Sequence, residues 1–162
     1  MTRFLGVDPG YARCGWGIVE DSDNGLKAIE CGVIATPDTL PFPQRLNTVM
    51  IGVRQILNDY AVDWLGVEHP IHGPNVTNSV EVGAAYGAVL LAGWDMTIPT
   101  FTFWPSQVKA AVANGRASKA EVKAGVVSLL NLSVPPKPDD AADALAIAIC
   151  TRDRWRLAEM AK

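Results

Sequence analysis

Four acidic residues stand at positions where their carboxylates could meet. Asp8 and Glu68 each directly follow a short apolar run that reads as a strand. Asp140 and Asp143 are three residues apart at the start of a predicted helix, so they lie on one face of it. Sites in α/β sheets form just beyond the carboxyl ends of the strands. If the two apolar runs are parallel neighbours, we expect Asp8 and Glu68 to lie side by side.

Four converging carboxylates need positive charge, because each like neighbour raises the pKa of the others. Two divalent cations would supply it, and hard oxygen ligands suit Mg²⁺, with Mn²⁺ as a substitute. Taken singly, each acid has a structural explanation: Asp-Pro-Gly at Asp8 is a turn signal, and acids such as Asp139 and Asp140 are favoured where a helix starts. Taken together, Asp8, Glu68, Asp140 and Asp143 indicate a two-metal phosphodiesterase.

Basic residues gather in the last third of the chain. The net charge is −3, but residues 1–100 hold 5 Lys and Arg against 11 Asp and Glu, whereas residues 101–162 hold 9 against 6. A local basic face binds phosphate whatever the whole-chain charge is, although scattered lysines also form ordinary solvated helix faces. The candidate phosphate contacts are Lys109, Arg116, Lys119 and Lys123.

The periodicity of the apolar residues predicts an α/β fold. We expect strands at 3–8, 14–20, 26–36, 64–68 and 98–103, and helices at 42–60, 75–95, 105–113, 118–130 and from 139 past 148. The first three strands follow one another through short turns and should be antiparallel, while helical connections allow the last two to be parallel. Small residues at 83–88, within the helix predicted at 75–95, imply that another element or another subunit approaches this helix closely.

Length and composition predict one domain spanning residues 1–162. This length suffices for one substantial core, and 49% hydrophobic and 19% charged residues are typical of a globular chain. We find neither an apolar run long enough for a membrane helix nor the organisation of a signal peptide. The three cysteines are odd in number and widely spaced, which favours buried thiols in a reducing compartment. We therefore expect a cytoplasmic location.

Several motifs resemble those of RuvC-type Holliday-junction resolvases. The resemblance covers roughly residues 3–150, and the Asp-x-x-Asp-Ala-Leu-Ala motif after a Pro-rich loop is the most specific part of it. The matching residues are 4–10 with Gly15 and Gly17, 66–68, Asn78, Gly83, Tyr86 and Gly87, 107–109, Ser118 with Lys119, and 140–148.

This resemblance implies an RNase H-like fold and a homodimer with two metal ions per site. The implied reaction is paired nicking of a four-way DNA junction in recombination and repair, with a branch-migration motor complex as a possible partner. The loop after Glu68 departs from the family, because it lacks the Phe or Tyr with which many relatives stack on a junction base. Ile71 and His72 are our candidates for contacting DNA there.

Three other functions share some of these features. A ribonuclease acting on RNA–DNA hybrids would use the same fold. An actin-like ATPase also opens with an Asp-containing strand, but this chain is short for two such domains and lacks a second Gly-rich phosphate loop. An inactive junction-binding module would not need all four carboxylates.

Overall fold

A five-stranded mixed sheet forms the centre of the molecule. The computed structural model describes residues 1–71 and 76–161. The strands are β1 (Thr2–Asp8), β2 (Arg13–Ser22), β3 (Gly25–Ala35), β4 (Trp64–Glu68) and β5 (Thr100–Phe103), in the spatial order β3-β2-β1-β4-β5. β1, β2 and β3 are antiparallel, and β1, β4 and β5 are parallel. The α/β sheet of three antiparallel and two parallel strands is confirmed.

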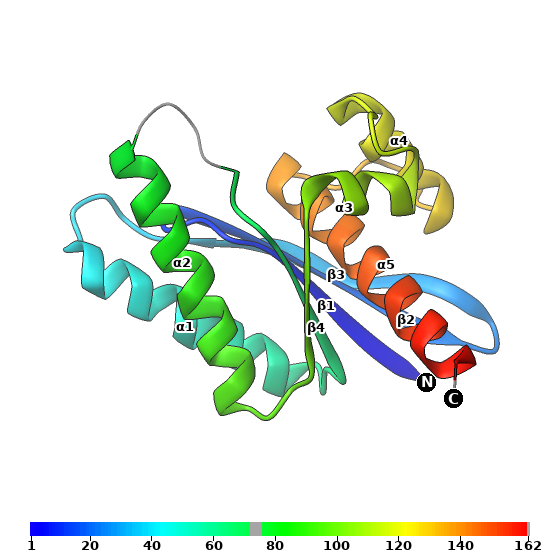
Figure 1. Cartoon of the computed structure of the whole chain (residues 1–162), viewed down its shortest axis with the longest axis horizontal. Helices are drawn as coiled ribbons and strands as arrows, with labels where there is room; N and C mark the ends of the chain where they lie inside the picture. The colour runs from blue at the N-terminus through cyan, green and yellow to red at the C-terminus, as the bar shows by residue number, and fades with distance from the viewer. Residues whose placement is uncertain (72–75, 162) are drawn as a thin grey trace.

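Helices cover both faces of this sheet (Figure 1). They are α1 (Phe42–Asp59), α2 (Val76–Asp95), α3 (Pro105–Val112), α4 (Lys119–Leu129) and α5 (Asp139–Met160). α1 and α2 lie on one face, while α5 crosses the other and carries α3 and α4 on its outer side. Of the helices in residues 1–71 and 76–161, none combines the length and the apolar character that a membrane span requires.

Most predicted boundaries agree with the structure to within two residues. The start of β5 differs by two residues, and the contacts before it explain why. We expected this strand from residue 98, but it begins at Thr100. The Ile98 amide instead donates to the Gly93 carbonyl oxygen at 3.0 Å and closes the end of α2, while Thr97 has a φ of 55°. Pro99 has no N–H to give to a ladder.

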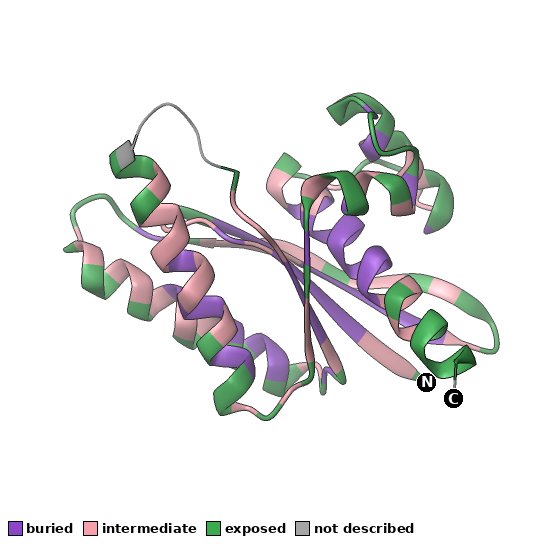
Figure 2. Ribbon diagram, viewed as in Figure 1, coloured by how far each residue is buried: buried purple, intermediate pink, exposed green. Residues whose placement is uncertain are grey.

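The central strand β1 is buried on both sides. Its side chains alternate, so that Phe4 packs into the core beneath α3, α4 and α5, whereas Leu5 and Val7 pack into the core beneath α1 and α2. Figure 2 shows the buried residues concentrated along the strands and the sheet-facing sides of the helices. Asp8 therefore projects from the end of a strand held on both faces.

Glycines let α5 lie directly on the sheet. A Cβ on Gly6 would stand 2.2 Å from the carbonyl oxygen of Ala144, and one on Gly15 would stand 2.3 Å from that of Asp140. The facing helix contributes small side chains as well, because Ala141 and Ala144 are fully buried. This close contact fixes the position of the first turns of α5 relative to the carboxyl end of β1.

The small residues of α2 divide between two environments. Ala85 is fully buried within the chain, but apart from the helix's own nearby backbone, no atom of residues 1–71 and 76–161 lies within 4 Å of a Cβ built on Gly83 or Gly87. Of the two alternatives for this segment, close approach within the chain holds for Ala85 and does not hold for these two glycines.

The cysteines only partly follow the sequence-based expectation. Cys14 and Cys150 are buried, but Cys31 on β3 is half-buried. The prediction of a buried thiol is therefore wrong for Cys31, which lies on a long strand at the edge of the sheet with incomplete cover.

Candidate active site

Asp8 and Glu68 end two neighbouring parallel strands. β1 and β4 pair in a register that puts Val7 opposite Val67, so the next residues of both strands emerge at the same edge of the sheet. The prediction that these two strands are parallel neighbours is confirmed. Both acids are half-buried there, where water solvates a carboxylate only in part.

The first turns of α5 bring two more acids to this edge. The Asp140 carboxylate accepts a hydrogen bond from Arg13 Nε at 2.9 Å. The Asp143 carboxylate lies 3.2 Å from Lys119 Nζ, at the start of α4. These two ion pairs give the site cations from elements that flank α5 on either side.

The carboxylates perturb one another electrostatically. Burial, followed by the charges of Asp143 and Asp140, raises the pKa of Asp8 to about 6. Burial, followed by the charges of Asp8 and Asp143, raises the pKa of Glu68 to about 7. Deprotonating both groups is thus unfavourable without further positive charge, even with Lys119 nearby.

The acids of the site lie near one another without enclosing a single metal position. Within the described residues, no three His, Cys, Asp or Glu side chains stand close enough together to enclose a metal ion. Arg13 and Lys119 hold Asp140 and Asp143 in ion pairs instead. Oxygen-only donors suit a hard divalent cation, and the raised pKa values of Asp8 and Glu68 mean that added positive charge would stabilise their ionised forms.

Asp139 faces a different direction from its neighbour. Its carboxylate pairs with Lys123 on α4, and 63% of its side chain is exposed. Asp140, and not Asp139, is among the charges that raise the pKa of Asp8. This geometry supports the choice of Asp140 as the acid of this pair that serves the site.

A hollow of about 230 Å³ adjoins the carboxylates. It is lined in part by Glu68, Asp143, Lys109, Lys119 and Ile71. Two of the predicted phosphate contacts and one predicted loop contact therefore lie beside the acids. Ile71 is 74% exposed there.

The other predicted DNA contacts lie elsewhere or cannot be placed. Arg116 is exposed in the turn before α4, and Lys123 is engaged with Asp139. Neither lines the hollow beside the acids. His72 lies outside the described residues.

Two features of the site were missed by the sequence analysis. Arg13 reaches Asp140 across 127 residues of sequence, and no local spacing signals such a contact. Trp104 directly follows β5 and stacks on His69, which directly follows β4, with ring centroids 4.4 Å apart. The strand-end reasoning that selected Asp8 and Glu68 would have selected Trp104 if applied to β5.

Comparison with known proteins gives a consistent result. A family model for crossover junction endodeoxyribonuclease RuvC matches residues 4–151. The protein of that name from Halothermothrix orenii is 44% identical over 154 residues, which cover 94% of this chain and 93% of the relative. The one from Thermomicrobium roseum is 43% identical over 159 residues, covering 98% and 97%.

Solved structures agree with the sequence relatives. The structure of Thermus thermophilus RuvC matches with a TM-score of 0.88 at 30% identity, covering 97% of both chains. The same protein in complex with a Holliday junction substrate matches with a TM-score of 0.86 at 29% identity, covering 97% of this chain and 96% of that one. The expected RNase H-like architecture is thereby confirmed, and the chain belongs to the RuvC family of crossover junction endodeoxyribonucleases.

Proposed function

We propose that this chain is a metal-dependent endonuclease that resolves four-way DNA junctions by paired nicks. The observation that carries the proposal is that four carboxylates lie within electrostatic reach of one another at one edge of the sheet, beside a hollow lined by Lys109 and Lys119. Family membership supports the substrate, since the relatives are named for crossover junctions.

Asp8, Glu68, Asp140 and Asp143 would hold the metal. Their donor set is oxygen alone, which favours Mg²⁺, with Mn²⁺ as a substitute, and the mutual repulsion of the four acids fits two ions. When bound, such ions lower the pKa of water and offset charge on the attacking and leaving oxygens of a phosphodiester.

The remaining polar residues position the acids and the substrate. Arg13 and Lys119 hold the carboxylates of Asp140 and Asp143 by ion pairs at 2.9 and 3.2 Å. Lys109 and Lys119 line the hollow and offer ammonium groups to the phosphates on either side of the scissile bond. Backbone contacts of this kind recognise junction shape more than base sequence.

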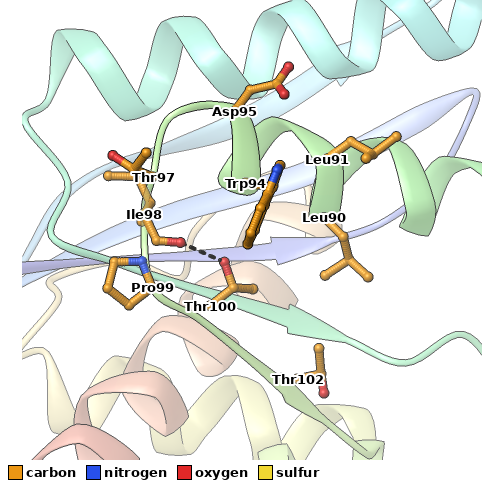
Figure 3. A pocket seen from close by; sticks show the side chains of 9 residues that line it. All are labelled: Leu90, Leu91, Trp94, Asp95, Thr97, Ile98, Pro99, Thr100 and Thr102. Carbon is orange, nitrogen blue, oxygen red and sulfur yellow. Dashed lines mark hydrogen bonds between the residues drawn. The ribbon is translucent and has the colours of Figure 1, made fainter.

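We further propose a homodimer that pairs through the outer face of α2. Figure 3 shows Leu90, Leu91 and Trp94 of α2 around a hollow whose other side is formed by the segment leading into β5. The hollow measures about 940 Å³, and Trp94 is 79% and Leu91 57% exposed. An apolar face of this kind favours burial against a partner.

A second copy is the occupant that suits this face. A four-way junction is symmetric and needs two opposed cuts, which a two-fold dimer presents to it. The open side of Gly83 and Gly87 lies on the same helix and would allow close approach of the partner's helix.

Amide substitutions test the function. Asp8→Asn, Glu68→Gln, Asp140→Asn and Asp143→Asn should each reduce nicking of a four-way junction in Mg²⁺ by about a thousandfold or more. Junction affinity should stay within a few-fold, because the phosphate and base contacts lie on other residues. Gel-based nicking and fluorescence-anisotropy binding measure the two effects separately.

Asp139→Asn is the matched control and should nick nearly as well as the parent, because Asp139 pairs with Lys123 away from the hollow. An inactive Asp139→Asn together with an active Asp140→Asn would reverse the ligand assignment. An RNA–DNA hybrid cleaved faster than the junction would replace the proposed activity by that of a ribonuclease.

A further inference from the structure

Three aromatic rings from different elements stand in a row beside Glu68. The ring of His69 lies between Tyr86 of α2, at 5.3 Å between centroids, and Trp104, at 4.4 Å. His69 and Trp104 are nearly parallel, with an interplanar angle of 27°. The row therefore ends in a flat indole that is backed by a second ring.

Hydrogen bonds fix the backbone segments that carry His69 and Trp104. The His69 amide donates to the Phe103 carbonyl oxygen at 2.8 Å, which extends the pairing of β4 with β5 by one residue. The Trp104 amide donates to Gln107 Oε1, also at 2.8 Å, at the start of α3. A ring that is carried on a fixed backbone and stacked on His69 loses little conformational entropy when a ligand stacks on its other face.

Trp104 is left open although its ring is large and apolar. It is 59% exposed while one face rests on His69. Other aromatic residues of β4 and β5 are better covered, since Phe103 is 4% exposed, and Trp64 stacks against Phe101 in the partly buried margin of the core. An exposed aromatic plate with a backing ring is a surface suited to binding another flat, apolar group.

The plate lies at the same edge of the sheet as the candidate active site. Glu68, directly before His69, and Pro105, directly after Trp104, line the hollow with Lys109 and Lys119, whereas the two rings lie outside it. A strand whose phosphate binds between those lysines and the acids can therefore extend along this edge and bring a neighbouring base to the indole. Cations for a phosphate beside a plate for a base match the two halves of a nucleotide.

We propose that Trp104, backed by His69, is a stacking platform for a junction base next to the scissile phosphate. This inference rests on the proposed function and adds a residue that selects and positions the substrate. Stacking orients the strand at the carboxylates, so Trp104 acts on both junction binding and the rate of nicking.

Four variants of the full-length protein test the platform. Trp104→Phe keeps a stacking face, Trp104→Leu keeps apolar bulk without one, and Trp104→Ala keeps neither. Leu157→Ala removes an equally exposed apolar side chain (61%) near the other end of α5. Each variant is assayed for kcat and KM on a four-way junction, with thermal unfolding as a check on folding.

Trp104→Ala and Trp104→Leu should lower kcat/KM by about fivefold to a hundredfold, the range that loss of one base stack predicts. Trp104→Phe should stay within about threefold of the parent, and Leu157→Ala should match the parent. Equal activity of the Leu and Phe variants would overturn the proposal, because apolar bulk would then suffice. A Phe variant as impaired as the Ala variant would overturn it too, since a phenyl ring also stacks.

A spectroscopic readout separates stacking from a structural role. Junctions carrying 2-aminopurine at each position flanking the cleaved bond are bound by Asp8→Asn protein, which leaves the DNA uncut. Fluorescence at one position should change on binding and should lose that change when Trp104→Leu is added to Asp8→Asn. An identical signal with and without Trp104 would refute the platform. Nicking by Asp8→Asn itself would refute the proposed function instead, so the two failures are distinguishable.

Discussion

Asp8 and Glu68 are placed where their charge is costly to the folded protein. Their raised pKa values of about 6 and about 7 come first from burial and then from the other acids of the site. An ordinary structural carboxylate would instead gain a hydrogen bond or a salt bridge, as Asp21 does with Arg156 at 2.7 and 2.8 Å. Repulsion left unrelieved at one point of a stable fold is the pattern expected of a ligand-binding site.

This repulsion predicts a pH-dependent stability in the absence of metal. Folded Asp8 binds its proton more tightly than unfolded Asp8, so its stabilising contribution is fully present below the ordinary aspartate pKa of 3.8 and is lost as the pH rises through the folded pKa of about 6. Asp8→Asn removes this titration. In EDTA the variant should therefore gain stability relative to the parent between pH 4.5 and 8, on the order of 1–3 kcal/mol, measured by urea unfolding.

Asp139→Asn should show the opposite sign. Lys123 holds the pKa of Asp139 below its ordinary value, so the stability from that pair is present at neutral pH and is lost in acid.

The outcome that would contradict the prediction for Asp8 is a stability difference between Asp8→Asn and the parent that is the same at the acidic and the alkaline end of this pH range. Ionised Asp8 would then not destabilise the folded protein. Added Mg²⁺ should reverse the advantage of Asp8→Asn at pH 8, since only the parent keeps the full ligand set.

At the residue scale, the position of the acids at one edge of the sheet could be predicted from the sequence, whereas their ion-pair partners could not. Asp8 and Glu68 end apolar runs, and Asp140 and Asp143 open an alanine-rich helix, all of which are local signals. The Arg13–Asp140 pair depends instead on where α5 crosses β2, which is a tertiary contact. Local pattern alone carries no information about such a crossing.

At the element scale, the site depends on how closely α5 approaches the sheet. Gly6 and Gly15 leave room for the backbone of α5, and alanines on the helix complete the contact. Strand propensity alone gives no reason for these glycines, because an isolated glycine disfavours a strand. These positions must be glycine because α5, which lies more than 120 residues later in the chain, packs directly on them. Strand propensity contains no information about such a distant contact.

The ends of α3 and α4 give the site its cations, and salt dependence tests their role. Lys109→Ala and Lys119→Ala should each reduce the slope of log K against log salt for junction binding by about one unit, as the loss of one phosphate contact predicts. Lys119→Ala should also lower the nicking rate, because it removes the partner of Asp143 at 3.2 Å. Anisotropy titrations at several NaCl concentrations measure the slopes.

Lys27→Ala is the matched control for these lysines. The Lys27 side chain is exposed, like that of Lys119, but it pairs with Glu20 of β2 at 2.9 Å. Its slope should equal that of the parent. Unchanged slopes for both Lys109→Ala and Lys119→Ala would place these two lysines on a solvated face without a role in binding.

At the scale of the whole molecule, the sequence predicted one α/β sheet correctly but left the environment of α2 open. A run of small residues fits either a tight contact within the chain or an interface. The structure shows the first for Ala85, which is buried, whereas Gly83 and Gly87 have open space above them within the described part of the chain and leave the second as our proposal. Periodicity describes which residues are apolar, and it does not distinguish the chain's own core from a partner's surface.

The open face of α2 predicts how cutting is coordinated. The parent should sediment as a dimer at micromolar concentration. Trp94→Glu should sediment as a monomer, because Trp94 is 79% exposed beside the hollow between α2 and β5, and a charge at this position would be buried in the proposed interface. On a supercoiled plasmid that extrudes a four-way junction, the parent should make two opposed cuts in one binding event and give linear product. The monomeric variant should give nicked circles first.

Gly87→Ala separates the interface from the stability of the subunit. Alanine raises helix propensity by about 1 kcal/mol, and the described residues offer no clash to the new Cβ. The variant should therefore unfold no more easily than the parent. If the partner's helix packs against this position, its dimer should be weaker and should dissociate at a higher protein concentration than the parent dimer. A parent that is monomeric at micromolar concentration, or a Trp94→Glu variant that still linearises the plasmid in one event, would remove α2 as the dimer contact. The two opposed cuts would then have to come from independent encounters, each limited by the time that a nicked junction survives before its strands rearrange.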